Sequence, residues 1–340
     1  MQMEKFINVL GIDLSKLTFD VGVIINGLKD NIRYRKFKKT QDGLQEFLDW
    51  LKQLGVSLNE QTLVCMEFTG LYNRMVLNFL EKTGIVIWVE MAAHIKQSLG
   101  LQRNKSDKFD AKRIAMFAWR NQDGVRMWSS VDKDSQKVKD MLAQRERLVD
   151  TKKRLLVPLE EMIQEGFGEE AEQLKKYQRP VITQLDNSID KIERAIKDVI
   201  NNNEKLKSKS ELVQSVKGVG LVICWYIIAF TNGFEHLKSG KSLACYCGVV
   251  PFENTSGTSV RSKARVSHIA NKKLKSLMHM GALCAVKYDD ELKAYYERKV
   301  AEGKNKMSVL NAVKNKLLLR VAAVLRENRK FEENYVHNAA

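Results

Sequence analysis

The spacing of apolar residues in the first 120 residues begins with strand patterns alone and then alternates between helical and strand patterns. This order restricts the fold more than any other feature. Apolar residues first follow the pattern of three successive strands joined by short turns, over 7–13, 17–23 and 31–38. Helical and strand patterns then alternate, over 44–54, 63–67, 72–82, 85–89 and a last helical stretch that reaches residue 119. This order predicts an α/β domain with one mixed sheet covered by helices.

Two carboxylates stand at the ends of predicted strands. Asp13 ends the first strand and Glu67 ends the fourth. The order of elements is that of an RNase H-like (RuvC-like) mixed sheet, in which such strand ends can converge. Taking an unpaired carboxylate out of water costs several kcal/mol, so something should compensate these charges. A divalent metal would do so most directly.

Asp107 and Asp110 are three residues apart in the last predicted helix of this region. If Ser106 is the N-cap, both project from one face of the first turns. Either acid alone is equally well explained as a surface group favoured near a helix N-terminus. The joint placement of four carboxylates points instead to Mg²⁺, or to Mn²⁺, because both ions prefer oxygen ligands. Asp20 and Glu90 lie in the same predicted sheet and are interpreted as bystanders.

The chain is predicted to have three domains. They are the RuvC-like domain (1–125), a helical coiled-coil hairpin (126–210) and a mainly α-helical C-terminal domain (211–335). The hairpin prediction rests on an apolar 3–4 spacing that continues over about three heptads near 182–199. We interpret the hairpin as an arm for self-association, and the alternative is an ordinary packed pair of helices.

The positive charge is concentrated near the C-terminus. The net charge is +16, and residues 258–330 contribute +12 of it, from 18 Lys/Arg and 6 Asp/Glu. Such a surface favours a polyanion, above all nucleic acid. The candidate contacts are Lys105, Arg261, Lys263, Arg265, Lys272, Lys273 and Lys275. No apolar run reaches the roughly 18 residues of a membrane span, and no signal peptide is recognisable, so we expect a cytoplasmic protein.

Two further features of the C-terminal domain have both a functional and a structural interpretation. Gly218 and Gly220 precede a predicted helix, where a helix-hairpin-helix-like turn would offer backbone N–H groups to a phosphate. The alternative is a helix–helix turn that needs a positive φ. Ser256 is predicted to lie in a polar loop over 252–265, where the surrounding cations could hold a phosphate against its hydroxyl. The alternative is a flexible basic loop that only grips a nucleic-acid backbone.

Taken together, the motifs resemble those of the IS110-family transposases, the DEDD recombinases with an N-terminal RuvC-like domain. The similar segments cover nearly the whole chain, at 11–16, 67–72, 105–111, 218–220, 244–251 and 256–257. By this resemblance Asp13, Glu67, Asp107 and Asp110 would be the metal-binding tetrad, and Ser256 the nucleophile that forms a covalent phosphoserine link to DNA. The resemblance also implies a structured non-coding guide RNA, donor and target DNA, and a homo-oligomer, either a dimer or a tetramer.

The main hypothesis is therefore an RNA-guided transposase that cleaves and exchanges DNA strands through Ser256 with Mg²⁺ held by the four acids. Transesterification through a serine conserves the phosphodiester energy, which agrees with the lack of a P-loop motif in the chain. A second hypothesis is a RuvC-like junction nuclease that uses metal-activated water and forms no covalent intermediate. A third is a non-catalytic protein that binds RNA or DNA.

Overall fold

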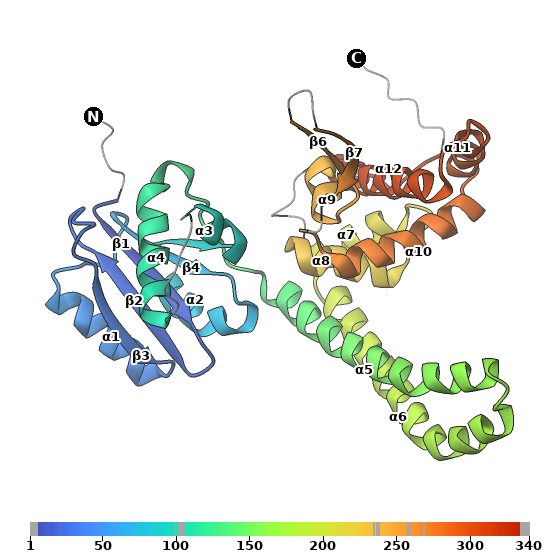
Figure 1. Cartoon of the computed structure of the whole chain (residues 1–340), viewed down its shortest axis with the longest axis horizontal. Coiled ribbons are helices and arrows are strands. Elements are labelled where there is room, and N and C mark those ends of the chain that lie inside the picture. The colour runs from blue at the N-terminus through green and yellow to red at the C-terminus, as the bar shows by residue number, and fades with distance from the viewer. Residues whose placement is uncertain are drawn as a thin grey trace. The chain divides into compact units, whose positions relative to one another are not determined.

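The protein divides into two compact units, residues 1–130 and 131–340, and each is described by itself (Figure 1). The computed structural model describes residues 6–98, 100, 106–233, 235, 239–256, 260–267 and 269–333.

The N-terminal unit contains a five-stranded mixed sheet with the strand order β3-β2-β1-β4-β5. The strands are β1 (Asn8–Leu14), β2 (Thr18–Ile24), β3 (Arg33–Lys38), β4 (Thr62–Glu67) and β5 (Val86–Glu90). The first three pair antiparallel, whereas β4 is parallel to β1 and β5 is parallel to β4. This topology confirms the RNase H-like mixed sheet predicted from the sequence.

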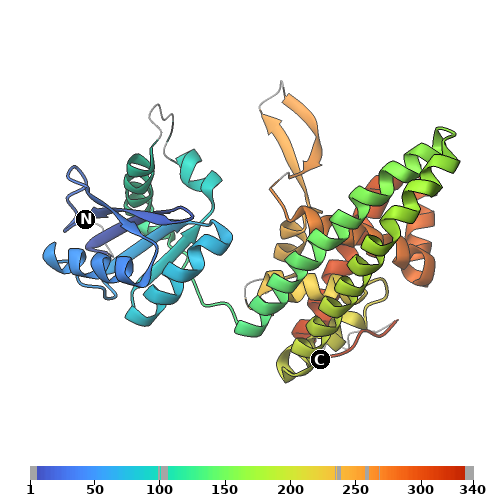
Figure 2. The ribbon, with the colours of Figure 1, turned by 90° about the horizontal axis from the view of Figure 1, so that it is seen from below.

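Helices cover both faces of this sheet, as the two ribbon views show (Figures 1 and 2). They are α1 (Gln41–Gln53), α2 (Arg74–Leu80), α3 (Ala92–Ser98) and α4 (Asp107–Arg120). Leu10 and Ile12 of β1 pack in one apolar cluster with residues of α1 and α2. Val9 packs in another cluster with residues of α3 and α4. Because side chains alternate along a strand, Gly11 and Asp13 face α4 together with Val9.

Helix α4 lies directly on the backbone of β1 and β2 because glycines stand at the points of contact. A Cβ atom at Gly11 would overlap the backbone nitrogen of Ala115 and the carbonyl oxygen of Ala111. A Cβ at Gly22 would lie 3.0 Å from the Ala111 oxygen and from Lys112 Cα. The absence of side chains at these two positions brings the first turn of α4 close to the end of β1.

The second unit is mostly helical. Its elements are α5 (Lys133–Gln164), α6 (Gly168–Asn201), α7 (Glu204–Gln214), α8 (Leu221–Thr231), α9 (Gly240–Tyr246), β6 (Pro251–Ser256), β7 (Val260–Val266), α10 (Lys272–Tyr288), α11 (Asp290–Ala301) and α12 (Lys306–Glu327). Helix α8 is apolar around its whole circumference, with Ile223–Ala229 all buried, so it forms the centre of the core.

Helices α5 and α6 form the predicted antiparallel hairpin, whose far end extends away from the helical core (Figures 1 and 2). The charged residues that interrupt the apolar pattern of α5 pair across the hairpin. Arg145 contacts Glu193 at 2.7 Å, and Lys152 contacts Asp186 at 2.6 Å. Self-association through this hairpin remains a prediction.

The base of the hairpin shares one core with the C-terminal segment. Val138 of α5 and Ile196 of α6 are buried in the same cluster as residues of α8, α10 and α12. The structure therefore groups the predicted domains 126–210 and 211–335 into one compact unit, and it ends the N-terminal unit at Ser130. Among the described residues, no helix is both long and apolar enough to cross a membrane.

The prediction of a polar loop over 252–265 is wrong. Strands β6 and β7 pair antiparallel in a two-stranded hairpin, with Phe252 opposite Arg265 and Ser256 opposite Val260. The register shifts between Phe252 and Asn254. The segment lacks a periodic apolar face, but backbone hydrogen bonding needs no such face to build a two-stranded ribbon.

Replacing Gly11 with alanine tests the close approach of α4. We expect Gly11→Ala to lower the free energy of unfolding by about 3 kcal/mol, the upper end of the usual cost of overpacking, because its Cβ would overlap backbone atoms that cannot move independently. Denaturant unfolding followed by tryptophan fluorescence would measure this, since four of the five tryptophans lie in residues 1–130.

Gly124→Ala is the matched control. A Cβ there would meet no atom within 4 Å, so we expect a change within about 0.5 kcal/mol. A Gly11→Ala variant as stable as the wild type would show that α4 does not depend on this contact.

Candidate functional site

Four acids stand side by side across four neighbouring strands. The pairing of β1 with β2 places Asp13 opposite Asp20, and the pairing of β4 with β5 places Glu67 opposite Glu90. Ile12 lies opposite Met66 in a parallel pair, so the next residues, Asp13 and Glu67, lie side by side at the ends of adjacent strands. Alternation along each strand places all four side chains on the sheet face covered by α4.

The first turn of α4 adds two more acids above this row. Ser106 is the N-cap by its extended backbone, as predicted, although its side chain makes no capping hydrogen bond. Burial raises the pKa of Asp13 to about 6, and the charges of Asp110, Glu67, Asp107 and Asp20 add to this increase, in that order. The four acids singled out in the sequence are therefore close enough to influence one another's charge.

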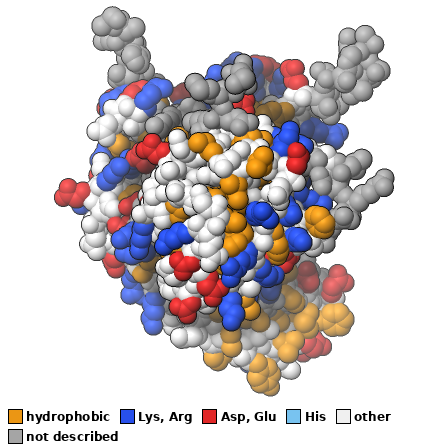
Figure 3. Space-filling model, turned by 90° about the vertical axis from the view of Figure 1, so that its left-hand side faces the viewer, with side chains coloured by type: hydrophobic (Ala, Val, Ile, Leu, Met, Phe, Trp, Pro, Cys, Tyr) orange, Lys and Arg blue, Asp and Glu red, His pale blue; other side chains and the backbone are white. Residues whose placement is uncertain are grey.

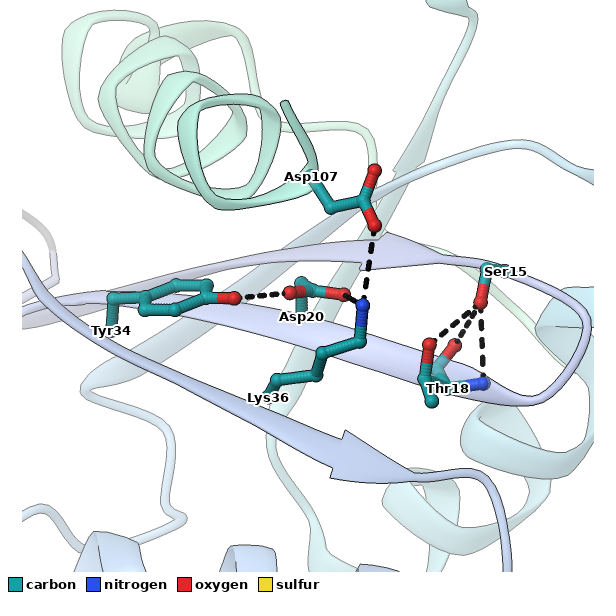
Figure 4. A network of polar contacts seen from close by, with 6 residues as sticks. All are labelled: Ser15, Thr18, Asp20, Tyr34, Lys36 and Asp107. Carbon is teal, nitrogen blue, oxygen red and sulfur yellow. Dashed lines mark hydrogen bonds and ion pairs between the residues drawn. The ribbon is translucent and has the colours of Figure 1, made fainter. Parts of the chain in front are cut away.

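Two of these acids are held by cations that the sequence analysis did not single out. Lys36 Nζ on β3 lies 3.3 Å from a carboxylate oxygen of Asp107 and 3.5 Å from one of Asp20 (Figure 4). Arg113, one turn along α4, contacts Asp110 at 2.9 Å.

Tyr34 completes this network. Its hydroxyl donates a 2.5 Å hydrogen bond to Asp20 (Figure 4). Burial and this bond raise the pKa of Tyr34 to about 12. Tyr34 pairs with Gly22 and Lys36 with Asp20 on the neighbouring strand, so both side chains lie on the sheet face that α4 covers. The two-residue alternation along β3 was the signal that could have identified them.

Asn73 fixes the chain just beyond Glu67. Its buried side chain donates to the Glu67 carbonyl oxygen at 2.8 Å and accepts from the Thr69 backbone nitrogen at 2.6 Å and from the Thr69 hydroxyl at 3.0 Å. These bonds hold the loop after β4 in one conformation and so set the position from which the Glu67 side chain projects.

Glu90 has its own set of partners. Its carboxylate accepts from Trp88 Nε1 at 3.2 Å and lies 3.2 Å from His94 and 3.4 Å from Arg126. Asp20 is likewise engaged by Tyr34 and Lys36. These contacts account for both buried charges without a role in chemistry, in agreement with their interpretation as bystanders.

The chemistry of the donor set suits a hard divalent cation, because all four candidate ligands are carboxylates. Within the described residues, however, no three acidic, histidine or cysteine side chains meet at one point that could hold an ion. The ion pairs of Asp107 with Lys36 and of Asp110 with Arg113 explain this. Both aspartates would have to exchange these partners for a metal, whereas the described residues form no such ion pair with Asp13 or Glu67.

Several predicted site residues lie outside the described part of the chain. Lys105 is one of them. Of Ser256, Arg261 and Lys263 the structure describes the backbones, which belong to β6 and β7, but not the side chains. Arg265 is exposed beside a hollow of about 360 Å³ lined by Phe252, Glu253, Arg265 and Ser267. Lys273 contacts Glu146 at 2.8 Å, whereas Lys272 is exposed at the start of α10.

Gly218 adopts φ +90°, and a Cβ there would lie 2.7 Å from the carbonyl oxygen of Gly281 in α10. The structural interpretation, a helix–helix turn that needs positive φ, accounts for this residue. Gly220 is the N-cap of α8 and would have open space around an added Cβ. A phosphate contact at Gly218 or Gly220 remains a prediction.

The face of the N-terminal unit that Figure 3 turns toward the viewer shows no large patch of a single charge among its described residues. In the view of Figure 3, Lys and Arg side chains are interspersed with Asp and Glu.

The raised pKa of Asp13 predicts a pH-dependent stability in the absence of divalent metal. Between about pH 4 and 6 the folded state holds the Asp13 proton that the unfolded state has lost, so the free energy of unfolding falls as the pH rises. Above about pH 6 Asp13 is ionised in both the folded and the unfolded state, and the cost of its buried charge lowers the free energy of unfolding in full. We expect Asp13→Asn to be more stable than the wild type at pH 7 in EDTA, with the difference vanishing near pH 4.

Tryptophan-monitored unfolding at a series of pH values measures this difference. Asp30→Asn, which changes an exposed acid in a turn, is the control and should follow the wild type. An Asp13→Asn variant that is less stable than the wild type at pH 7 would contradict the prediction.

Comparisons with known proteins show the family of the chain. A transposase model for IS110 DEDD proteins matches residues 10–167, and a model described as transposase IS116/IS110/IS902 family matches residues 210–297. The chain is similar to a pilin gene-inverting protein of Moraxella bovis, with 26% identity over 332 residues, which are 95% of this chain and 97% of that protein.

Two other similar proteins match a smaller part of this chain. An uncharacterized 43.6 kDa protein of insertion element IS110 from Streptomyces coelicolor is 25% identical over 139 residues, 41% of this chain and 34% of that protein. The solved structure of T. thermophilus RuvC in complex with a Holliday junction substrate covers 36% of this chain and 99% of its own, at 15% identity and a TM-score of 0.27. The fold assignment rests on the strand order instead. The two transposase models match successive regions, one with the acids and one with the basic helices, and the chain belongs to the IS110 family of transposases.

Proposed function

We propose that this protein is the DNA recombinase of a mobile element, which cleaves and rejoins DNA strands at specific sites. The observation that carries the proposal is the position of Asp13, whose charge is influenced by Glu67, Asp107 and Asp110 from a second strand and a helix. The similarity to the pilin gene-inverting protein over nearly both full lengths supports it, because inverting a gene requires that DNA strands be cut and rejoined.

In this proposal Asp13, Glu67, Asp107 and Asp110 hold Mg²⁺, for which Mn²⁺ could substitute. A bound divalent cation would neutralise negative charge on the phosphate oxygens and on the leaving oxygen. The chain supplies the geometry: Asp13 and Glu67 project from strands, Asn73 holds the loop beside Glu67, and Gly11 lets α4 bring its aspartates near. Lys36 and Arg113 neutralise the α4 aspartates until the site is filled.

Ser256 is the proposed nucleophile. Its hydroxyl would lose its proton as its oxygen forms a bond to phosphorus. The bond from phosphorus to the leaving sugar oxygen breaks, and that oxygen takes up one proton, so the protons balance. One phosphodiester replaces another, so the reverse attack rejoins a strand without ATP. Ser256 is the last residue of β6, where it pairs with Val260 of β7, in the same segment as the candidate phosphate contacts Arg261, Lys263 and Arg265, and this supports its proposed role.

The proposed partners are donor DNA, target DNA, a structured non-coding guide RNA that selects the sites by pairing, and further copies of the chain, as a dimer or a tetramer. The far end of the α5–α6 hairpin supports self-association, because large apolar side chains are exposed around it. They are Val157, Ile163, Phe167, Leu174, Tyr177 and Val181. Such a group of exposed apolar residues is typical of an interaction surface.

A junction nuclease without a covalent intermediate is the second candidate. It is favoured by the location of all four acids in the N-terminal unit, whereas Ser256 belongs to the other unit. In that case the C-terminal unit would only bind nucleic acid.

Covalent trapping separates the two candidates. In cells that carry the gene with its native flanks, we expect a protein–DNA adduct on denaturing gels for the wild type. Both Ser256→Ala and Asp13→Asn should lose it together with the recombinant junctions. Ser262→Ala, which changes a serine of β7 in the same hairpin, is the matched control and should keep both. Metal-dependent nicking that persists in Ser256→Ala would support the nuclease instead.

Competition between Lys36 and a metal for Asp107 gives a second test. Lys36→Met should increase the affinity of the protein for Mn²⁺ by up to about fivefold, because a partly exposed ion pair is worth at most about 1 kcal/mol. Titration of Mn²⁺ followed by its electron paramagnetic resonance signal measures this.

Lys52→Met is the matched control, since Lys52 also pairs with an aspartate, Asp49, but on α1 at the opposite face of the sheet. It should bind Mn²⁺ like the wild type. Weaker binding by Lys36→Met would show that Lys36 supports the metal site rather than competing with it.

A further inference from the structure

Lys314 on α12 is a buried cation for which the described part of the chain supplies no partner. Only 7% of its surface is exposed, and its neighbours Val313 and Leu317 belong to the apolar core. No ion pair or hydrogen bond of its ammonium group is found among the described residues. Helix α12 packs against α10, which carries Lys275, in this core. Burial and the charge of Lys275 lower the pKa of Lys314.

Three other partly buried cations of this unit have acidic partners and so differ from this pair. Lys273 contacts Glu146 at 2.8 Å, Lys299 contacts Glu302 at 2.6 Å, and Arg320 contacts Asp289 at 2.6 Å. Lys275, like Lys314, has no acidic partner in the described regions. Two like charges held together in a half-buried place raise the free energy of the folded state unless an anion joins them.

The surrounding contacts place both lysines at the base of the β6–β7 hairpin. Asn311, three residues before Lys314, donates its side-chain amide to the Val249 carbonyl oxygen at 2.7 Å, just before β6 begins. Lys275 Cδ lies 3.6 Å from the position of a Cβ at Gly248, and the Ser267 carbonyl oxygen lies 3.8 Å from it. Ser267 also lines the 360 Å³ hollow with Phe252 and Arg265.

We propose that Lys275 and Lys314 together bind one phosphate group of a nucleic-acid backbone at the base of the hairpin that carries Ser256. This inference rests on the proposed function and extends it with a defined contact. Arg265 at the edge of the hollow adds a third positive charge nearby. The ligand is a phosphodiester, because its two free oxygens can accept from two ammonium groups at once. Its charge removes the repulsion between the lysines.

The test is the salt dependence of binding by the full chain in EDTA, where metal-dependent cleavage cannot occur. The probes are a duplex DNA and a single-stranded RNA labelled for fluorescence anisotropy. Lys314→Met should weaken binding about tenfold. It should also reduce the slope of log affinity against log salt by about one, the value for one lost phosphate contact. Loss with only one probe identifies which nucleic acid supplies the phosphate.

Three further variants sharpen the test. The double variant Lys275→Met/Lys314→Met should lose no more slope than either single variant, because both lysines contact the same phosphate. Lys314→Arg keeps the charge and should keep the slope. Lys293→Met, which removes an exposed lysine on α11, is the control and should bind within twofold of the wild type.

Thermal unfolding without nucleic acid separates binding from a structural role. We expect Lys314→Met to unfold at the same or a higher temperature than the wild type, because methionine removes a buried charge and keeps the apolar stem. If both Lys275→Met and Lys314→Met bind DNA and RNA with the affinity and slope of the wild type, the inference is wrong. Loss of strand cleavage with intact binding would bear on the proposed function alone.

Discussion

The contact between α4 and the glycines of β1 and β2 is the constraint on which the acid site depends. Gly11 and Gly22 have no side chain, so the helix backbone lies against the strand backbone at these positions. This close approach brings Asp110 and Asp107 near enough to Asp13 to raise its pKa. Longer side chains at the glycines would keep the helix at the usual distance of a packed layer and separate the carboxylates.

The acid site illustrates how a protein can keep several carboxylates together before a metal arrives. The charge of Asp13 is destabilised by burial and by the neighbouring acids, as its raised pKa shows. Asp107 and Asp110 avoid that cost by pairing with Lys36 and Arg113. The same ion pairs occupy the carboxylates of both aspartates, so a folded and stable site need not be one that is arranged for metal. In our proposal metal binding exchanges one set of positive charges for another.

The C-terminal unit has a different balance of charge. Its core surrounds α8, and most of the half-buried cations around that core have acidic partners. Lys275 and Lys314 depart from this pattern at the base of the β6–β7 hairpin. Unneutralised charge beside the segment that carries the proposed nucleophile suggests that the two features serve one ligand, the nucleic-acid backbone.

Much of this protein is determined by local sequence. Periodicity alone predicts the strand and helix order of the N-terminal unit, because one face of each element must be apolar, and it places Asp13 and Glu67 at strand ends. The helical hairpin follows from the apolar spacing of α6. The sequence did not predict the β6–β7 hairpin, since backbone pairing left no apolar period to recognise.

Only the tertiary structure decided which distant groups meet. Lys36 reaches Asp107 across 71 residues, Asn311 reaches Val249 across 62, and the helix of Lys314 packs against the helix of Lys275. The alternation along β3 indicates on which face of the sheet Lys36 lies, but no local pattern identifies the distant group that each of these side chains meets. Periodicity records which side of an element is buried, whereas the partner of a buried charge depends on the three-dimensional packing of elements that are far apart in the chain.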